Sequence, residues 1–363
     1  MVDISLFKSI TVRSMIVKKT LLAKAIFVSI VVASTSSLFL ISFGKDPITS
    51  FYYFFLNAFS YPHGIAESLI KATPLILCST GLLYAFNSDF LNIGAEGQLH
   101  IGAAFAVWLG LSFGGLPPIL VLIAAGLFGF IGGGIWALIP MVLKIKLKVN
   151  EVLSTLMMNS IGILLVNYLV SDPWRDKAGW ELWTPDLSSS YWLPKIIAGT
   201  RLHIGFLIAL SFVVVYFIIL NKTALGYKSK VMGKSRAIAN YAGISILKTS
   251  LLVALLSGGL AGIAGMIEIY GVQHHLLVGF SPGYGYFAIL VAFLSGASFL
   301  SATVLSILFG ILIVGGMGIQ LMGVPDAISR IIVGMLFLAI VLTKIFNKSK
   351  NSGAQVNGEK LWP

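Results

Sequence analysis

The chain has 363 residues, of which 57% are hydrophobic and 10% are charged, and its mean hydropathy is +0.95. Soluble globular domains carry about 25% charged residues, so the composition excludes a soluble protein and predicts a polytopic, all-α membrane protein. The net charge of +12 does not indicate nucleic-acid binding, because the basic residues cluster in short segments between apolar runs instead of forming a continuous stripe.

The chain contains about ten apolar runs that are long enough to cross a bilayer roughly 30 Å thick. The predicted spans are residues 25–43, 64–86, 92–111, 119–143, 152–170, 202–220, 249–270, 284–298, 302–320 and 328–344. Glycines within these runs predict close helix packing, and some of the helices are expected to be broken. Residues 25–345 form the predicted transmembrane domain, between a basic N-terminus at residues 1–24 and a polar tail at residues 346–363 that is expected to be disordered.

The basic residues set the predicted orientation of these spans. Segments predicted to face the cytoplasm hold about threefold more Lys and Arg than those predicted to face the exterior, so both termini are expected in the cytoplasm. Residues 221–248 contain six basic residues and no acidic one, which places this loop inside. A basic head before an apolar run is also typical of a signal peptide, but residues 34–37 offer no A-x-A cleavage site, and an uncleaved first helix is expected.

Two segments are predicted to lie at the exterior surface. Residues 46–63 are rich in Phe and Tyr, which is typical of an interfacial aromatic belt. The loop at residues 171–201 combines balanced charge with four tryptophans, and it is either an interfacial element or a docking surface for an external partner. Just after the first segment, Glu67 and Lys71 are spaced i, i+4 and are predicted to pair on one helix face.

A polar stretch at residues 86–102 interrupts the apolar pattern. Its polar side chains are Asn87, Asp89, Asn92, Glu96, Gln98 and His100. At membrane depth each polar group needs an internal partner or a water-filled cavity, so the stretch is either a lined pathway or a solvent loop. Our hypothesis is the pathway, with Asn92, Glu96 and Gln98 along it, because the glycines nearby permit a break between half-helices.

No motif in the sequence indicates catalysis. Residues 226–234 place six residues between their glycines, where a Walker A phosphate-binding loop has four. The sequence contains neither an H-E-x-x-H pattern nor a Cys/His cluster with metal-ligand spacing, and His274-His275 is interpreted as an ordinary pair in an exterior loop. The chain is therefore predicted to be no enzyme and to hold no cofactor of its own.

Within the basic inner loop, the segment from Lys234 to Gly243 is predicted to form a short helix. Ala237, Ile238 and Tyr241 fall at helical spacing and give this helix an apolar face. Such a helix either lies on anionic lipid or docks into a groove of a soluble partner, and the spacing alone leaves both explanations open.

Four blocks of the sequence carry distinctive motifs. They are F-L-N-I-G-A-E-G-Q at 90–98, V-N-E-V-L-S-T-L-M-M-N at 149–159, G-Y-K-S-K-V-M-G-K-S-R-A-I-A-N-Y-A-G-I at 226–244 and G-F-S-P-G-Y-G at 279–285. In motif and in order these blocks resemble the permease subunits of ABC importers in the branched-chain amino acid, ribose and nucleoside superfamily. They are nearest the nucleoside and simple-sugar branch that works with basic-membrane-lipoprotein-type binding proteins, and the resemblance covers roughly residues 60–345.

The resemblance implies a transmembrane permease subunit of the cytoplasmic membrane that imports nucleosides, or as a second choice simple sugars, by alternating access. The implied partners are an ATP-binding subunit that hydrolyses ATP, a second permease subunit that is identical or a paralogue, and an extracytoplasmic substrate-binding lipoprotein. The polar block at residues 92–98 would lie by the translocation path, and the inner-loop helix would be the coupling helix that enters a groove on the ATPase. The implied coupling residues are Lys234, Arg236, Ala237, Ile238, Ala239, Tyr241 and Gly243.

A secondary transporter driven by an ion gradient is the alternative from a different class. It predicts buried acidic and basic residues within several spans. The residues that approach this description are Glu67, Lys71, Glu96 and Glu268.

Overall fold

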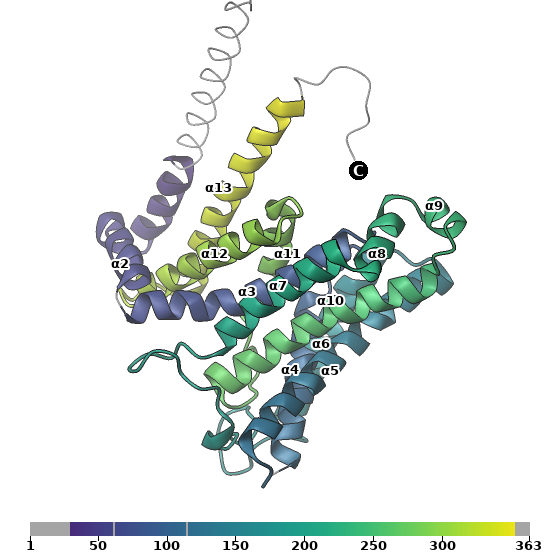
Figure 1. Ribbon diagram of the computed structural model, residues 1–363. Helices are drawn as coiled ribbons and strands as arrows, with labels where there is room; N and C mark the ends of the chain where they lie inside the picture. The colour runs from purple at the N-terminus through teal and green to yellow at the C-terminus, as the bar shows by residue number, and fades with distance from the viewer. Residues whose placement is uncertain (1–29, 61, 114, 353–363) are drawn as a thin grey trace, which may run out of the picture. The chain divides into compact units, whose positions relative to one another are not determined.

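The computed structural model describes residues 30–60, 62–113 and 115–352, with side chains as far as residue 339 (Figure 1). The regular structure of this part is helical apart from two isolated β-bridges, which confirms the predicted all-α class. The predicted N-terminal segment at residues 1–24 and the end of the predicted tail at residues 353–363 lie outside the described residues. The chain forms two compact units, which are described separately.

The larger unit is Tyr61–Ile311. Its helices are α3 (His63–Phe86), α4 (Ala95–Ser112), α5 (Pro118–Leu147), α6 (Glu151–Ser171), η1 (Ser189–Tyr191), α7 (Gly205–Lys222), α8 (Ala224–Lys234), α9 (Arg236–Tyr241), α10 (Ile246–Glu268), η2 (Ile269–Gln273), α11 (Tyr284–Ser295) and the first part of α12 (Phe299–Gln320). This unit contains the polar stretch and the basic inner loop.

The smaller unit is Met1–Ser60 with Leu312–Pro363. Its described helices are Ile30–Ser42, α2 (Pro47–Phe59), the end of α12 and α13 (Asp326–Ser352). The aromatic segment predicted at residues 46–63 is thus largely helical, because Asp46 caps α2 by accepting from the Thr49 N–H at 2.7 Å and Pro47 occupies the first turn. Helix α13 reaches Ser352, past the start of the predicted tail at residue 346.

Six helices in the described part of the chain are long and apolar enough to cross a membrane. They are α3, α5, α6, α7, α10 with η2, and α12, and they coincide with six of the predicted spans. Helix α11 has 12 residues, which at 1.5 Å per residue reach about 18 Å of a bilayer about 30 Å thick. The count of ten spans and the cytoplasmic location of both termini stay predictions.

Close helix packing holds the centre of the larger unit, where α10 packs against α3, α4 and α5. A Cβ added at Gly262 of α10 would collide with the carbonyl oxygen of Gly129 on α5, and one added at Gly102 of α4 would collide with Gly262. Only glycine permits backbones to approach this closely, which confirms the packing role predicted for the glycine-rich spans.

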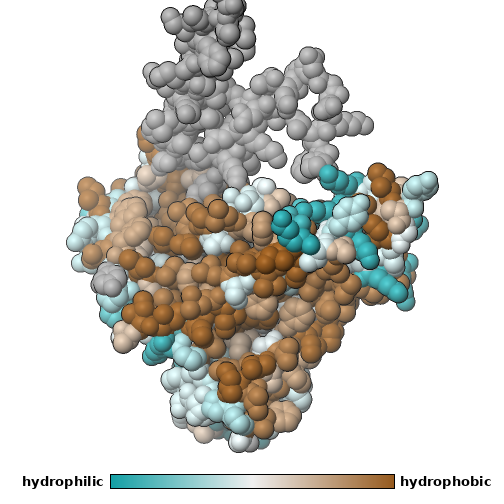
Figure 2. Space-filling view, in the orientation of Figure 1, coloured by the Kyte–Doolittle hydropathy of each residue, from teal (hydrophilic) through white to brown (hydrophobic). Residues whose placement is uncertain are grey.

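The surface of the larger unit changes character from α7 to α8. Figure 2 shows mainly apolar surface over α7, whose exposed side chains include Leu207, Val214 and Phe217. It shows hydrophilic side chains gathered over α8 and α9, where the sequence is rich in lysine. This division is expected where a lipid-facing helix leads into a basic loop that faces water.

Candidate functional site

Two short helices of the larger unit meet at their N-termini. Helix α4 begins at Ala95 after a non-helical segment, and α11 begins at Tyr284 after Gly283, whose φ is +101°. The N–H of Gly285 donates to Oε2 of Glu96 at 2.6 Å, and a Cβ added at Gly285 would collide with the backbone of Glu96. A carboxylate suits this place because the first turn of a helix presents unpaired N–H groups and the positive end of the dipole. That these are parts of broken helices stays a prediction.

Asn92 and Gln98 form a reciprocal pair of carboxamides, here called the amide pair. Gln98 Nε2 donates to Asn92 Oδ1 at 2.9 Å, and Asn92 Nδ2 donates to Gln98 Oε1 at 3.0 Å. Asn92 also donates to Oγ of Ser257 on α10 at 3.0 Å and accepts from the N–H of Gly94 at 2.9 Å. Both side chains are almost fully buried, and these hydrogen bonds offset the cost of removing them from water.

Helix α6 holds the segment that leads into α4. Asn159 Oδ1 accepts from the N–H of Gly97 at 2.8 Å, and Asn159 Nδ2 donates to the carbonyl oxygen of Ile93 at 2.8 Å. One turn earlier, Thr155 Oγ1 accepts from the N–H of Ile93 at 3.2 Å. Thr155 and Asn159 were not predicted as site residues, although their i, i+4 spacing in an apolar helix indicates a shared polar face.

The three predicted pathway residues are brought into one buried region but do not share one surface. Asn92 and Gln98 face each other, whereas the carboxylate of Glu96 lies against α11. The backbone carbonyl of Glu96 lies 2.9 Å from Nδ1 of His100, one turn along α4. Asn92, Glu96 and Gln98 are each at most 2% exposed. A role in a pathway therefore requires these contacts to open.

Glu67 and Lys71 do not form the predicted ion pair on α3. Lys71 Nζ lies 3.6 Å from Oε1 of Glu268 on α10, and the Tyr284 hydroxyl donates to the same oxygen at 3.5 Å. Glu67 instead accepts two hydrogen bonds of 2.8 Å from Arg201. The prediction was wrong because an i, i+4 pair contributes only about 0.2–0.5 kcal/mol, and charged partners on other elements compete with it.

The loop at residues 171–201 is joined to the segment after η2. The N–H of Leu187 donates to the carbonyl oxygen of His274 at 2.8 Å, and the imidazole of His274 stacks on Trp192 with 3.7 Å between ring centroids. His203 follows this loop and is buried.

The predicted inner-loop helix corresponds to α9, which begins just after Ser235, and a separate helix, α8, precedes it. Helix α8 ends at Lys234, and α9 spans Arg236–Tyr241 with Ser235 as its N-cap. Ser235 has an extended backbone, with φ −161° and ψ 118°, which suits an N-cap and interrupts a continuous helix. Gly243, with φ +71°, follows α9, so the helix ends where the sequence predicts.

The residues of α9 divide between an outward and an inward face. Tyr241 is 97% exposed and Ile238 is 61% exposed, and the flanking Ala237 and Gly243 are also exposed. Ala239, in contrast, is fully buried against the rest of the chain. The outward face therefore consists of Ile238 and Tyr241, and Ala239 supports α9 from beneath.

Helix α8 packs on the end of α3. The hydroxyl oxygens of Tyr84 and Ser229 lie 3.1 Å apart. A Cβ added at Gly233 would collide with the carbonyl oxygen of Asn87, so this close approach requires glycine. The inner loop is thereby fixed to the segment that leads into the polar stretch.

The sequence profile of the family described as "Branched-chain amino acid transport system / permease component" matches residues 64–341. The chain is 33% identical to the guanosine ABC transporter permease protein NupP of Bacillus subtilis, over 80% of this chain and 85% of the relative. It is 30% identical to the glucose ABC transporter permease protein TsgB13 of Haloferax volcanii, over 85% and 84%. It is 27% identical to the nucleoside ABC transporter permease protein NupB of Lactococcus lactis, over 84% and 86%. No solved structure was found to match the chain.

Proposed function

The chain belongs to the family of branched-chain amino acid transport system permease components, and from this premise we propose that it imports nucleosides as the membrane-spanning subunit of an ATP-driven ABC importer. As a member of this family it is a membrane transport protein and not an enzyme, and ATP is hydrolysed on a separate subunit. It lies in the cytoplasmic membrane. The family implies an ATP-binding subunit and a substrate-binding protein as partners.

Nucleosides are the proposed cargo, and simple sugars are the second choice. Of the three relatives described above, the one with the highest identity is named for guanosine, another for nucleosides and the third for glucose. Both cargo classes are uncharged and rich in hydroxyl groups, and the carboxamides of Asn92, Gln98 and Asn159 donate and accept hydrogen bonds without carrying charge. A nucleoside also presents a base, whose edge a carboxamide meets with two hydrogen bonds.

Asn92, Glu96 and Gln98 are proposed to lie by the translocation path. The support for this role is a set of buried polar groups at the point where α4 and α11 meet by their N-termini. Transporters use such discontinuous helices to present polar groups to cargo. In alternating access, the amide pair would exchange its mutual hydrogen bonds for bonds to the passing cargo.

The observation that carries the importer proposal is the outward face of α9. Tyr241 and Ile238 are large, apolar in part and highly exposed, although they lie on a short helix within a basic loop. Exposed apolar side chains in such a setting are typical of a protein contact. We place them in a groove of the ATP-binding subunit, with Lys234, Ala237 and Gly243 beside them.

Uptake into proteoliposomes tests the transport class and the cargo together. The vesicles contain the chain with its ATP-binding subunit, second permease subunit and substrate-binding lipoprotein. Labelled guanosine is expected to accumulate when ATP is supplied, and an excess of unlabelled glucose is expected not to compete. If the vesicles took up labelled glucose but not guanosine, simple sugars would replace nucleosides as the proposed cargo. Uptake driven by an ion gradient without ATP would refute the ABC proposal and favour a secondary transporter.

The substitution Tyr241→Ala tests docking of α9. A central tyrosine at an interface contributes about 2 kcal/mol or more, so affinity for the ATP-binding subunit is expected to fall by roughly thirtyfold. The matched control is Tyr227→Ala on α8, since Tyr227 is 67% exposed. The measurements are the amount of ATP-binding subunit retained on purification and the rate of cargo-stimulated ATP hydrolysis. Equal retention in the two variants would show that α9 does not dock there.

A further inference from the structure

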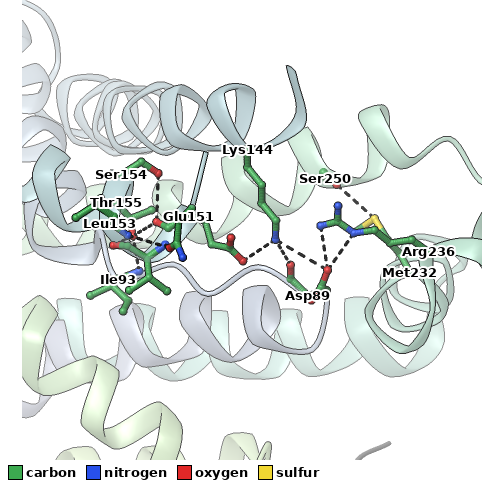
Figure 3. Close-up of polar contacts among 12 residues, drawn as sticks. Asp89, Ile93, Lys144, Glu151, Leu153, Ser154, Thr155, Met232, Arg236 and Ser250 are labelled. Carbon is green, nitrogen blue, oxygen red and sulfur yellow. Dashed lines mark hydrogen bonds and ion pairs between the residues drawn. The ribbon is translucent and has the colours of Figure 1, made fainter. Parts of the chain in front are cut away.

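Four charged side chains lie together where α9 meets the segment between α3 and α4 (Figure 3). Arg236 Nε donates to Asp89 Oδ2 at 3.0 Å, and Arg236 Nη2 lies 2.9 Å from the same oxygen. Lys144 donates to Oε1 of Glu151 at 2.7 Å and to the backbone carbonyl of Asp89 at 2.6 Å. Figure 3 shows Lys144 between Glu151 and Asp89, with Arg236 on the other side of Asp89. These four residues are called the Asp89 network.

The Asp89 network joins elements that are separate in the sequence. Lys144 lies in the last turn of α5, Glu151 is the first residue of α6, and Arg236 is the first residue of α9. Asp89 lies between α3 and α4 in a left-handed conformation with φ +57°, which aspartate tolerates better than most residues. The network therefore connects α9 to three elements around the polar stretch.

Two routes lead from the Asp89 network to the amide pair. The first is the backbone, because Asp89 precedes Asn92 by three residues. The second passes through α6, where Thr155 Oγ1 donates to the carbonyl oxygen of Glu151 at 2.6 Å and accepts from the N–H of Ile93 at 3.2 Å. A displacement of the network thus reaches the segment that contains Asn92 from two directions.

The orientation of Arg236 separates it from the outward residues of α9. Its guanidinium is engaged with Asp89, whereas Ile238 and Tyr241 face away from the rest of the chain. A charge-assisted hydrogen bond defines both distance and direction, so a movement of α9 that keeps this contact carries Asp89 with it. The side chains of Arg236 and Asp89 are 44% and 49% exposed, so water can replace the contact at low cost when it separates.

We propose that the Asp89 network is the link by which movement of α9 on the ATP-binding subunit changes the position of the amide pair. The inference rests on the proposed importer function and extends it. Arg236 and Asp89 are positioning residues in this mechanism, since they act on the path through the segment before α4. Arg236 was predicted to contact the ATPase, whereas in the structure its partner is Asp89 within the same chain. The competing explanation is an ordinary surface ion pair that only holds the loop.

The test compares Asp89→Asn and Arg236→Gln, singly and together, in the complete complex with its ATP-binding subunit and lipoprotein. Asparagine also tolerates a left-handed backbone, so Asp89→Asn removes charge without new strain. The measured quantity is labelled guanosine transported per ATP hydrolysed. Each single change is expected to lower this ratio by about fivefold or more, the range typical of coupling between two sites. The double variant is expected to be no worse than the singles, because both remove the same contact.

A matched control and a docking measurement decide the outcome. The control is Lys228→Gln, which removes one exposed positive charge from α8, outside both the Asp89 network and the residues proposed to contact the ATPase, and it is expected to leave the ratio unchanged. All variants are expected to retain the ATP-binding subunit. The inference alone is refuted if the ratio stays at the wild-type value, if Lys228→Gln lowers it equally, or if Arg236→Gln releases the ATP-binding subunit. A wild-type complex without cargo-stimulated hydrolysis would refute the proposed function, and this inference with it.

Discussion

Two ion pairs of the larger unit differ in distance and in burial, and the pair with the longer distance is the more deeply buried one. Lys71 and Glu268 lie 3.6 Å apart, and their side chains are 9% and 1% exposed. Arg236 and Asp89 lie 2.9 Å apart, and their side chains are 44% and 49% exposed. The fold depends more on the longer pair, because the loss of one partner there leaves a charge that water does not reach. Distance alone is therefore a poor guide to what an ion pair contributes.

The difference matches the position of each pair in the fold. The buried pair lies where α3, α10 and α11 converge, and the Tyr284 hydroxyl shares its carboxylate oxygen. Such a contact fixes the relative position of helices. The exposed pair lies at the edge of the inner loop, where its charges exchange protein partners for water with little change in free energy. The amide pair is the intermediate case, since it is buried but uncharged.

The largest expected effect comes from breaking the buried pair. Glu268→Gln or Lys71→Met alone is expected to lower the free energy of unfolding by about 3–5 kcal/mol, because one charge stays buried without its partner. The double variant removes both charges and is expected to recover most of this loss. Thermal unfolding of the purified protein measures the three variants. Single variants as stable as the wild type would show that the bundle does not depend on this pair.

The amide pair is expected to give the intermediate effect. Gln98→Ala or Asn92→Ala leaves one buried carboxamide without its partner and is expected to cost about 1–3 kcal/mol of stability. The double variant is expected to be more stable than Asn92→Ala, because it has no unpaired side-chain carboxamide, while the Gly94 N–H lacks its acceptor in both. Guanosine uptake separates the two roles of these residues. Uptake that stays low in the stable double variant supports the pathway, whereas recovery of both properties would mean that the amides serve packing only.

The smallest expected effect on stability comes from the exposed pair. Asp89→Asn is expected to change the free energy of unfolding by less than about 1 kcal/mol, and the change is expected to shrink as salt rises from about 0.1 M to about 1 M. Unfolding at the two salt concentrations measures this dependence. If Asp89→Asn lowered the free energy of unfolding by several kcal/mol at both salt concentrations, Asp89 would contribute to stability as much as the buried pair does, and this prediction would be wrong.

The positions of the main spans were predictable, because the transfer of an apolar run from water into a bilayer depends on that run alone and not on the rest of the chain. Helices α3, α5, α6, α7, α10 and α12 coincide with predicted spans, since a long apolar run has few alternatives in a bilayer. Helix α2 was missed, although Asp46 and Pro47 form a recognisable helix start, because the aromatic residues that follow also suit a membrane interface. The predicted start of the inner-loop helix, Lys234, lies two residues before the start of α9, because Ser235 has an extended backbone and caps the helix.

The side-chain partners within the candidate site were not predictable from spacing. Asn92, Glu96 and Gln98 were recognisable because polar groups among apolar runs are costly. Their neighbours Asn159 and Ser257 were not, because these residues come from helices distant in the sequence. All of α9 was predicted to be a contact surface, whereas packing buries Ala239 and turns Arg236 to Asp89.

The sequence by itself determined that this is an all-helical membrane protein, where its long apolar helices lie and which four blocks mark it as a permease. The first two properties follow from local composition, because the hydrophobic effect and backbone hydrogen bonding act within each segment. The four blocks indicate a permease through their resemblance to a known family. Only the tertiary structure decided that Lys71 pairs with Glu268 and that Glu67 pairs with Arg201. A charged group pairs with the opposite charge that the packed helices bring within reach, and sequence separation does not limit that choice.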